Sequence, residues 1–521
     1  MSLNFPVWSD LSAVKKGSST TNAWDEALMR AERQLSYWSG LVFEETIPDV
    51  TTTGDQAPLM FPVGMNLVKM LTVAQADGMY GEWETRPVEF VVRDDEADVG
   101  STERDAAALA NSIVDATTPH FFWEHALDRE VFGGAAFQVA PTNQPGSHIR
   151  WKRLTRDQFF PIWDPTDPDN LLEVFVVTTM TPEQAEAKFG HRTKKDYVQM
   201  VEHWTPGVYE TTLDGVRMNA YSGYNPWGVV PFVYCPRLRF INWWGEALTD
   251  DIIPSQDELN ARVADIGEAI NYNSHPVRWG VNLPLKFNAE NFPLDANAMW
   301  DLGRTIGSTP PPPVGLLEAK AAVEQGSHEY ISFVYDWTRT SVFAPPIAFG
   351  EDNGGGQRSG ATLEIRMWPL IKSIRRSRAY LSSAFRRAIH ISGLILKQKQ
   401  YSDVKSRGVN AILEGMIVPR FAEVMPRDQA ALVDEVVKLL STNPPAISLE
   451  TSQTVLGRGP SEVSRIEAML KKTELWGKAI LQAPPKEAPE EGEDSAHSVS
   501  NRRALPVPGR ESQGGSAEDR Q

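Results

Sequence analysis

Apolar residues recur at helical spacing along the first part of the chain. They repeat every three or four positions in residues 22–40 and 60–76, and again in residues 101–115 and 121–131. This period is typical of helices that bury one face. The sequence therefore predicts a largely helical N-terminal region, with one strand near residues 82–95, where apolar and polar residues alternate.

Between Gly133 and Arg237 the pattern changes to short runs of β-branched and aromatic residues, separated by Pro, Gly, Asn and Asp. Such runs predict strands joined by turns. They include AAFQVA, HIRWKRL, LLEVFVVTTM, YVQMVEHW and VVPFVYC. One short helix, starting at Thr181 and Pro182, is predicted between them. We expect an α+β fold with a mainly antiparallel sheet.

A long amphipathic helix is predicted after Gly245. Its apolar residues share one stripe, and most of its acids lie on other faces. Pro254 should either kink this helix or mark its first turn. The stripe consists of Leu248, Ile252, Leu259, Val263, Ile266 and Ile270. Such a stripe needs a partner to cover it.

A second long helix is predicted over Leu316–Ser341, where Tyr330, Val334 and Trp337 follow one another at spacings of four and three. Between the two helices lie short strand candidates and the run Pro310 to Pro313. The pair of helices thus brackets a compact insert bounded by prolines.

Residues 344–360 contain five glycines and two prolines and predict an exposed, flexible loop. A very long helix is predicted from about Ala361 to Gln400, with a kink at Pro369. This helix is basic, in contrast to the chain as a whole. Its basic residues include Lys372, Arg375, Arg376, Arg378, Arg386, Arg387, Lys397 and Lys399.

The C-terminal part is predicted to consist of shorter helices at about 427–440, 449–456 and 460–476. Residues 481–521 carry only scattered apolar side chains. They cannot bury enough surface to offset the entropy of ordering, so we expect disorder there.

Composition limits the class of protein. Hydrophobic residues make up 41% of the 521 residues, and the formal net charge is −17. Such an acidic chain is a poor candidate for wrapping the outside of DNA by neutralising phosphates. The single cysteine, Cys235, excludes an internal disulfide framework and a multi-thiolate metal site, and fits a reducing compartment. We expect neither a signal peptide nor a membrane-spanning segment.

Motifs of familiar enzymes do not occur. The sequence has no Walker A, HExxH or GxSxG pattern, and no cofactor motif stands out. The acidic cluster formed by Asp94, Asp95, Glu96 and Asp98 is a weak candidate for a cation site and a better one for a solvated turn.

Two further features allow two interpretations each. The basic residues of the 361–400 helix either pair with acids on neighbouring helices, which we favour, or contact nucleic acid. The pair Trp243 and Trp244 serves as a packing anchor more often than as a stacking platform.

The order of these elements is more informative than any single motif. An α+β domain is followed by a helix, a small insert, a returning helix, a glycine-rich loop, a long kinked basic helix and a helical C-terminal part. This order resembles the portal proteins of tailed bacteriophages, of the siphophage type. The segments that carry the resemblance are VVPFVYCPR at 229–237, GEALTDDIIPSQDELNARVADIGEAINYNSHP at 245–276 and RSGATLEIRMWPLIKSIRRSRAYL at 358–381.

The resemblance implies a division of the chain into the parts of the portal fold. These parts are an α/β wing (1–244), a stem helix (245–275), a small α/β clip (276–315), a second stem helix (316–343), a tunnel loop (344–358), a long kinked wing helix (359–400), a helical crown (401–480) and a disordered tail (481–521).

The resemblance also implies a function. Portal proteins are not enzymes. They form rings, typically of twelve subunits, at one vertex of the capsid, through which double-stranded DNA is packaged, retained and ejected. Their partners are the terminase, then the head-completion or adaptor proteins, and the major capsid and scaffold proteins. The expected location is the virion, after assembly in the cytoplasm of the bacterial host, without a membrane partner.

In such a ring, some residues of this chain would face the DNA. The tunnel loop would present Asp352, Asn353, Gly354, Gly355, Gly356, Gln357 and Arg358. By helical phase, Asp257, Glu258, Asp265 and Glu268 would line the channel and repel the DNA backbone, so that DNA slides rather than sticks.

Three other classes of protein stay open from the sequence. A DNA-binding protein unrelated to phages and built on the basic 361–400 helix would lose affinity for DNA steeply as salt rises. Another capsid-vertex or scaffold protein would share the interface-rich composition. A magnesium-dependent nuclease using Asp94, Asp95 and Glu96 would need further carboxylates on adjacent strands and would cleave DNA when magnesium is added.

Overall fold

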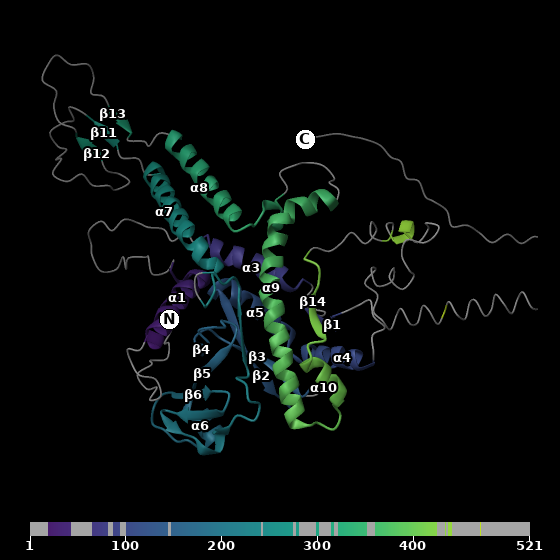
Figure 1. The fold of residues 1–521 in the computed structure, drawn as a ribbon. Coiled ribbons are helices and arrows are strands. Elements are labelled where there is room, and N and C mark those ends of the chain that lie inside the picture. The colour runs from purple at the N-terminus through teal and green to yellow at the C-terminus, as the bar shows by residue number, and fades with distance from the viewer. Residues whose placement is uncertain are drawn as a thin grey trace, which may run out of the picture. The chain divides into compact units, whose positions relative to one another are not determined.

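The computed structural model describes residues 19–42, 65–81, 87–93, 101–143, 147–240, 243–274, 278–280, 299–301, 314–316, 321–351 and 360–424, with isolated positions at 433, 436–439 and 469. Residues 1–427 form one compact unit, and residues 428–521 form a second. The first unit is a mixture of helix and mostly antiparallel sheet (Figure 1), as the α+β prediction requires.

The predicted N-terminal elements are present. They are α1 (Ser19–Ser39), α3 (Leu67–Tyr80), β1 (Val88–Val92), α4 (Ser101–Ala116) and α5 (Pro119–Phe132). Helix α3 begins later than the apolar pattern suggests, because the side chain of Asn66 caps it by accepting a hydrogen bond from the backbone N–H of Lys69 at 2.8 Å. The acidic cluster at residues 94–98 lies outside the described residues.

Two antiparallel sheets follow. One has the strand order β10-β2-β3, and the other has the order β4-β5-β6-β7-β8, with β9 paired to β7. The strands are β2 (Gly134–Pro141), β3 (Ile149–Leu154), β4 (Phe159–Trp163), β5 (Leu171–Met180), β6 (Val198–Trp204), β7 (Val208–Leu213), β8 (Val216–Arg217), β9 (Gly223–Tyr224) and β10 (Phe232–Pro236). The sequence pattern did not single out β4, β7, β8 and β9, which are short or rich in polar residues.

The predicted short helix is α6 (Pro182–Phe189), and its start is well defined. The hydroxyl of Thr181 accepts from the backbone N–H of Gln184, and the Gln184 side chain accepts from the Thr181 N–H. This reciprocal pair satisfies two donors that the first turn would otherwise leave free. A 3₁₀ turn, η2 (Asn219–Tyr221), precedes β9.

The long stem-like helices are α7 (Leu248–Ser274) and α8 (Ala321–Ser341), which run side by side (Figure 1). Between them lie β11 (Arg278–Gly280), β12 (Met299–Asp301) and β13 (Val314–Leu316), which form a small sheet of their own. Pro254 lies inside α7, so it does not mark the first turn. Residue 316 differs from the prediction: it belongs to β13, because its backbone pairs with Arg278, and α8 starts five residues later.

The predicted basic helix is α9 (Gly360–Lys399), the longest described helix. It changes direction in its N-terminal part (Figure 1), where Pro369 lies. A proline inside a helix removes one backbone hydrogen bond and clashes with the preceding turn, which explains the bend.

The chain after α9 differs from the division expected at residue 401. Helix α10 (Ser406–Leu413) packs on α4, and β14 (Ile417–Phe421) pairs with β1 in antiparallel register. Residues up to 424 therefore complete the N-terminal core, because β1 alone would expose an unpaired edge. The helices expected after residue 426 and the tail fall outside the described residues, apart from the isolated positions.

The main core joins α3, α4, α5, β2, β3, β10, α9 and α10. Inside it, the fully buried Arg129 of α5 donates to the carbonyl oxygens of Pro236 and Ser377, both at 3.1 Å, and to the Ser377 hydroxyl at 2.7 Å. Its neighbour Glu130 is equally buried and accepts from Arg237 at 2.5 Å. Arg129 therefore connects α5 with the end of β10 and with α9.

Candidate assembly surface and DNA-facing residues

The inner faces of α7 and α8 are held by one apolar cluster. Ile252 and Leu259 of α7 and Val334 of α8 are buried there against Leu67 and Leu71 of α3. The predicted stripe of α7 is therefore covered in its N-terminal half. Towards the C-terminal half, Val263 and Ile266 are only half-buried, and the side chain of Ile270 lies outside the described residues.

Helix α8 carries a second apolar face that nothing in the described chain covers. Tyr330, Phe333 and Trp337 are 44%, 61% and 63% exposed, and the rings of Phe333 and Trp337 lie 6.4 Å apart. Contiguous exposed aromatic surface of this kind is rare on a monomer and marks interaction sites. The sequence spacing placed Trp337 on the same stripe as Val334, but the structure places Val334 inside and Trp337 outside.

The acids assigned to the channel lie on α7 in different surroundings. Asp257 is exposed and accepts a hydrogen bond from the Tyr37 hydroxyl at 2.6 Å. Glu258 and Asp265 both accept from Arg262, at 2.9 and 2.8 Å. Glu268 lies on the same helix, but its side chain is outside the described residues.

Glu258 also links the two helices. The Tyr330 hydroxyl of α8 donates to its carboxylate at 3.1 Å. Hydrogen bonds from Arg262 and then from Tyr330 stabilise the charged form, so the pKa of Glu258 lies below its ordinary value. This carboxylate is thus partly neutralised by Arg262, which weakens its repulsion of an approaching phosphate.

The loop predicted to touch DNA lies largely outside the described residues: positions 352–359 are not described, and they include every residue assigned to it, from Asp352 to Arg358. The preceding residues are less exposed than predicted. Ala344 is buried, η3 (Pro346–Phe349) forms a short turn, and Glu351 accepts from Arg339 at 2.8 Å. Ala344 and Phe349 pack in the apolar cluster between α3, α7 and α8, which explains why this part of the chain is less exposed.

Four basic residues of α9 divide into two groups. Arg378 is turned inward and donates to the backbone oxygens of Gly78, Met79 and Ala422 at 3.1, 2.8 and 2.6 Å. Burial lowers its pKa to about 10. It therefore has a structural role, though through carbonyl groups rather than through the acidic partners that we expected.

The second group is exposed. Lys372 and Arg375 lie over the ring of Trp368 at 5.1 and 5.6 Å, and Arg376 lies 6.0 Å from the ring of Phe343. Among the described residues, none of these three cations forms an ion pair within 4 Å. Together with Trp368 and Phe343 they form an aromatic and basic strip on the described surface.

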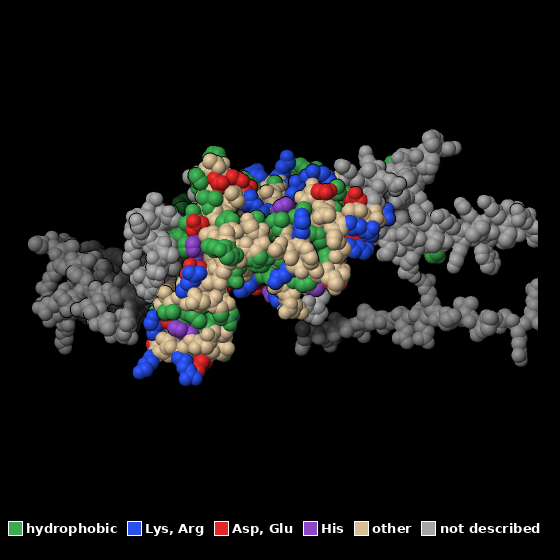
Figure 2. All heavy atoms as spheres, turned by 60° about the horizontal axis from the view of Figure 1, so that its bottom comes forward, with side chains coloured by type: hydrophobic (Ala, Val, Ile, Leu, Met, Phe, Trp, Pro, Cys, Tyr) green, Lys and Arg blue, Asp and Glu red, His purple; other side chains and the backbone are tan. Residues whose placement is uncertain are grey.

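Among the described residues, the face shown in Figure 2 has no continuous region of positive or negative charge. Basic, acidic and hydrophobic side chains are interspersed over its described part. This distribution differs from the continuous basic surface that a protein needs to hold DNA on its outside.

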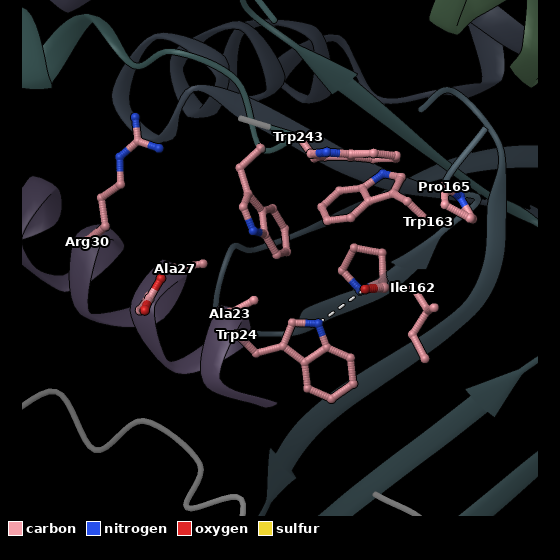
Figure 3. Close-up of a pocket in the computed structure, with 11 residues that line it drawn as sticks. Ala23, Trp24, Ala27, Arg30, Ile162, Trp163, Pro165 and Trp243 are labelled. Carbon is pink, nitrogen blue, oxygen red and sulfur yellow. Dashed lines mark hydrogen bonds between the residues drawn. The ribbon is translucent and has the colours of Figure 1, made fainter. Parts of the chain in front are cut away.

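The tryptophan pair at 243–244 belongs to an aromatic hollow (Figure 3). Trp244 packs edge-on against Trp163 with centroids 4.6 Å apart, and the guanidinium of Arg156 covers its ring at 3.5 Å. The packing interpretation is therefore correct for Trp244. Trp243 is more exposed and lines the hollow, which has a volume of about 700 Å³.

Sequence analysis did not find this hollow, because its walls come from three separate segments. The α1 wall is formed by Ala23, Trp24, Glu26, Ala27 and Arg30, and the opposite wall by Pro161, Ile162, Trp163, Pro165, Trp243 and Trp244. No local spacing connects these residues.

Neither a metal site nor a membrane span is found in the described chain. No group of three or more His, Cys, Asp or Glu side chains there is arranged to hold a metal ion. None of the described helices has the length and apolar character needed to cross a bilayer. A comparison with protein-family models and with curated proteins finds no match for this chain.

Proposed function

We propose that this chain is a subunit of a phage portal: a ring at one capsid vertex through which DNA is packaged, retained and ejected. In this proposal the chain is not an enzyme. It docks the terminase first and the head-completion proteins afterwards. The element order and the uncovered aromatic face of α8 support the proposal.

The aromatic face of α8 is the observation that carries it. Helix α8 buries Val334 on one side and exposes Phe333 and Trp337 on the other. A monomer would leave this second apolar face in contact with water, which is unfavourable. A closed circle of identical copies covers such a face in every subunit, because the contact is repeated by rotation. The two-helix stem then packs between two neighbours.

The charge of the chain suits a channel through which DNA moves. Each copy carries a formal charge of −17, and Asp257 and Asp265 are exposed on α7. Acids facing a lumen repel phosphates at short range, and salt limits this repulsion to about 10 Å. DNA would slide past such a wall rather than bind to it.

Negative-stain images of the purified chain test the proposal directly. We expect a ring with a central hole, of about twelve copies as in the family it resembles. A monodisperse monomer at high protein concentration would contradict the proposal. Incubation with duplex DNA and magnesium serves as a second test, since cleavage would favour the nuclease interpretation.

The loop assigned to the DNA can be tested in particles. Removing residues 352–357 should lower packaging or DNA retention, since the proposal has these residues touch the duplex. If particles with the shortened loop package and retain DNA like the wild type, the assignment of the loop is wrong even when the ring forms.

A further inference from the structure

The tryptophan hollow lies at one edge of the six-stranded sheet. Strand β4 ends the described strand order, and its residues Pro161, Ile162 and Trp163 form one wall. The opposite wall is α1, where Ala23 and Ala27 take up little space (Figure 3). Small residues facing large indoles leave the space open, so the hollow is an apolar socket that no described residue fills.

The opposite edge of the same sheet carries an aromatic side chain that no described residue covers. Tyr224 of β9 is 87% exposed. Its cross-strand partner on β7 is Val208, which is 47% exposed. Directly opposed residues of an antiparallel pair lie on the same face of a sheet, so the two form one apolar knob.

We propose that the knob, Tyr224 with Val208, enters the tryptophan hollow of a second copy of this chain. The inference rests on the proposed ring and names a contact between its subunits. Strands β5, β6 and β7 lie between β4 and β9, so four strand spacings separate the two sites, a distance of about 19 Å. A patch on one edge and its complement on the other make a head-to-tail contact, which closes into a ring when the rotation allows it.

The chemistry of the hollow suits a tyrosine. Indole rings such as those of Trp163 and Trp243 pack edge-to-face against another aromatic ring. Arg30 at the rim is already held by Asp250 and by the carbonyl of Gly245, so it adds no free charge. The carboxylate of Glu26 is exposed at the rim and can accept the phenolic hydrogen.

Another exposed aromatic residue is a weaker candidate for the knob. Phe240 is 86% exposed, but it is only three residues before Trp243, which itself lines the hollow. A knob beside its own socket would favour a two-fold contact, in which both copies use the same patch, and not a repeating contact.

Two single variants test the contact. Tyr224→Ser removes the knob, and Ala23→Trp fills the hollow from an exposed position of α1 that should tolerate a large side chain. Each should raise the protein concentration needed for half-maximal assembly by at least about tenfold, the effect of losing a central aromatic anchor. Tyr224→Phe should stay close to the wild type. Tyr197→Ser is the matched control, because Tyr197 is also exposed but precedes β6, whose start lies at the other end of the sheet.

Mixing the two variants gives the sharpest result. A Tyr224→Ser copy keeps its hollow and an Ala23→Trp copy keeps its knob, so one intact contact forms between them. At a protein concentration where the wild type forms rings and each variant alone is mostly monomeric, mass photometry of the mixture should show mixed dimers but no rings. Unchanged circular dichroism of both variants confirms that they fold.

The outcomes separate this inference from the proposed function. If the wild type forms rings and Tyr224→Ser forms them equally well, the proposed contact of Tyr224 is wrong, but the proposed ring is supported. If the wild type forms open filaments and Tyr224→Ser does not, the contact of Tyr224 is supported and the closed ring is wrong. A wild type that stays monomeric at every concentration overturns both.

Discussion

Gly133 and Gly245 let two backbone segments meet at the base of α7. Both have positive φ, 82° and 87°, and each stands directly against the carbonyl of the other. The N–H of Arg237 donates to the Gly133 carbonyl at 2.7 Å, so the close approach is part of how β10 continues towards α7. A side chain at either position would be strained by its φ and would also overlap backbone atoms.

A substitution can separate these two costs. Gly245→Ala should lower the free energy of unfolding by at least about 2 kcal/mol, since backbone strain and overlap add. Gly190→Ala is the control, because Gly190 has φ 70° but no atom within 4 Å of an added Cβ, so only the conformational cost of about 1 kcal/mol applies. Thermal melting compares them. Equal losses would show that the contact at Gly245 is not tight.

Arg378 provides a second prediction at this scale. Replacing it by Met leaves three carbonyl oxygens without their donor, so Arg378→Met should cost about 2–4 kcal/mol of stability. Arg375→Met, on the exposed side of the same helix, should change stability by less than about 1 kcal/mol. Denaturant titration of both variants measures the difference. Similar values for the two would place Arg378 among the surface cations.

At the scale of elements, Glu258 connects α7 to α8 in a way that depends on pH. Its pKa is below the ordinary value when the protein is folded. The stabilisation is therefore fully present above the unfolded pKa, about 4.3, and is lost as pH falls through the folded pKa. The helix pair should loosen in acid.

The test compares Glu258→Gln with the wild type between pH 7 and pH 3. At pH 7 the variant should melt at a lower temperature, because it loses the charged acceptor for Arg262 and Tyr330. Below about pH 4.3 the gap should shrink and then close. Glu32→Gln, at an exposed position of α1, should show no gap at any pH. If the difference in melting temperature between Glu258→Gln and the wild type grows in acid, the prediction is wrong.

Sequence periodicity predicted these elements well where one face is buried. The stripe of α7 was right for Leu248, Ile252 and Leu259, since a helix packed on α3 has one inner side. It was less informative for α8, where apolar residues occupy two faces and spacing cannot say which one is inside. The sequence did not predict strand β14, because its pairing partner β1 is more than 300 residues away and local spacing does not record such a contact.

For the whole molecule, the decisive property is whether copies associate. Phe333→Ser combined with Trp337→Ser should leave the melting temperature nearly unchanged, because both side chains are exposed in the monomer. The same pair should weaken assembly strongly, since a buried aromatic anchor is worth about 2 kcal/mol or more in a contact.

Val334→Ala is the matched control for this test. Val334 lies on the same helix but is buried on its inner side, so its truncation should destabilise the fold by about 1–3 kcal/mol. Sedimentation velocity reports assembly, and thermal melting reports folding. A double variant that assembles like the wild type would remove the main support for the ring.

The candidate sites were predictable to different degrees. The acids of α7 and the bases of α9 are visible in the sequence, but their partners are not. Arg378 bonds to carbonyls of two distant segments, whereas Arg375 faces outward three residues earlier. The tryptophan hollow and the knob at Tyr224 were invisible, because each depends on which strand lies at an edge.

The sequence by itself determined the periodic elements: the helices with one apolar face, the main strands, the capped start of α6 and the proline inside α9. These depend on neighbours a few residues apart, and local spacing records them. The tertiary structure alone decided which apolar face of α8 stays uncovered, that residues 401–424 complete the N-terminal core, and that Trp24, Trp163 and Trp243 share one hollow. Such features arise from contacts between segments far apart in the chain, and no local pattern encodes which segments meet.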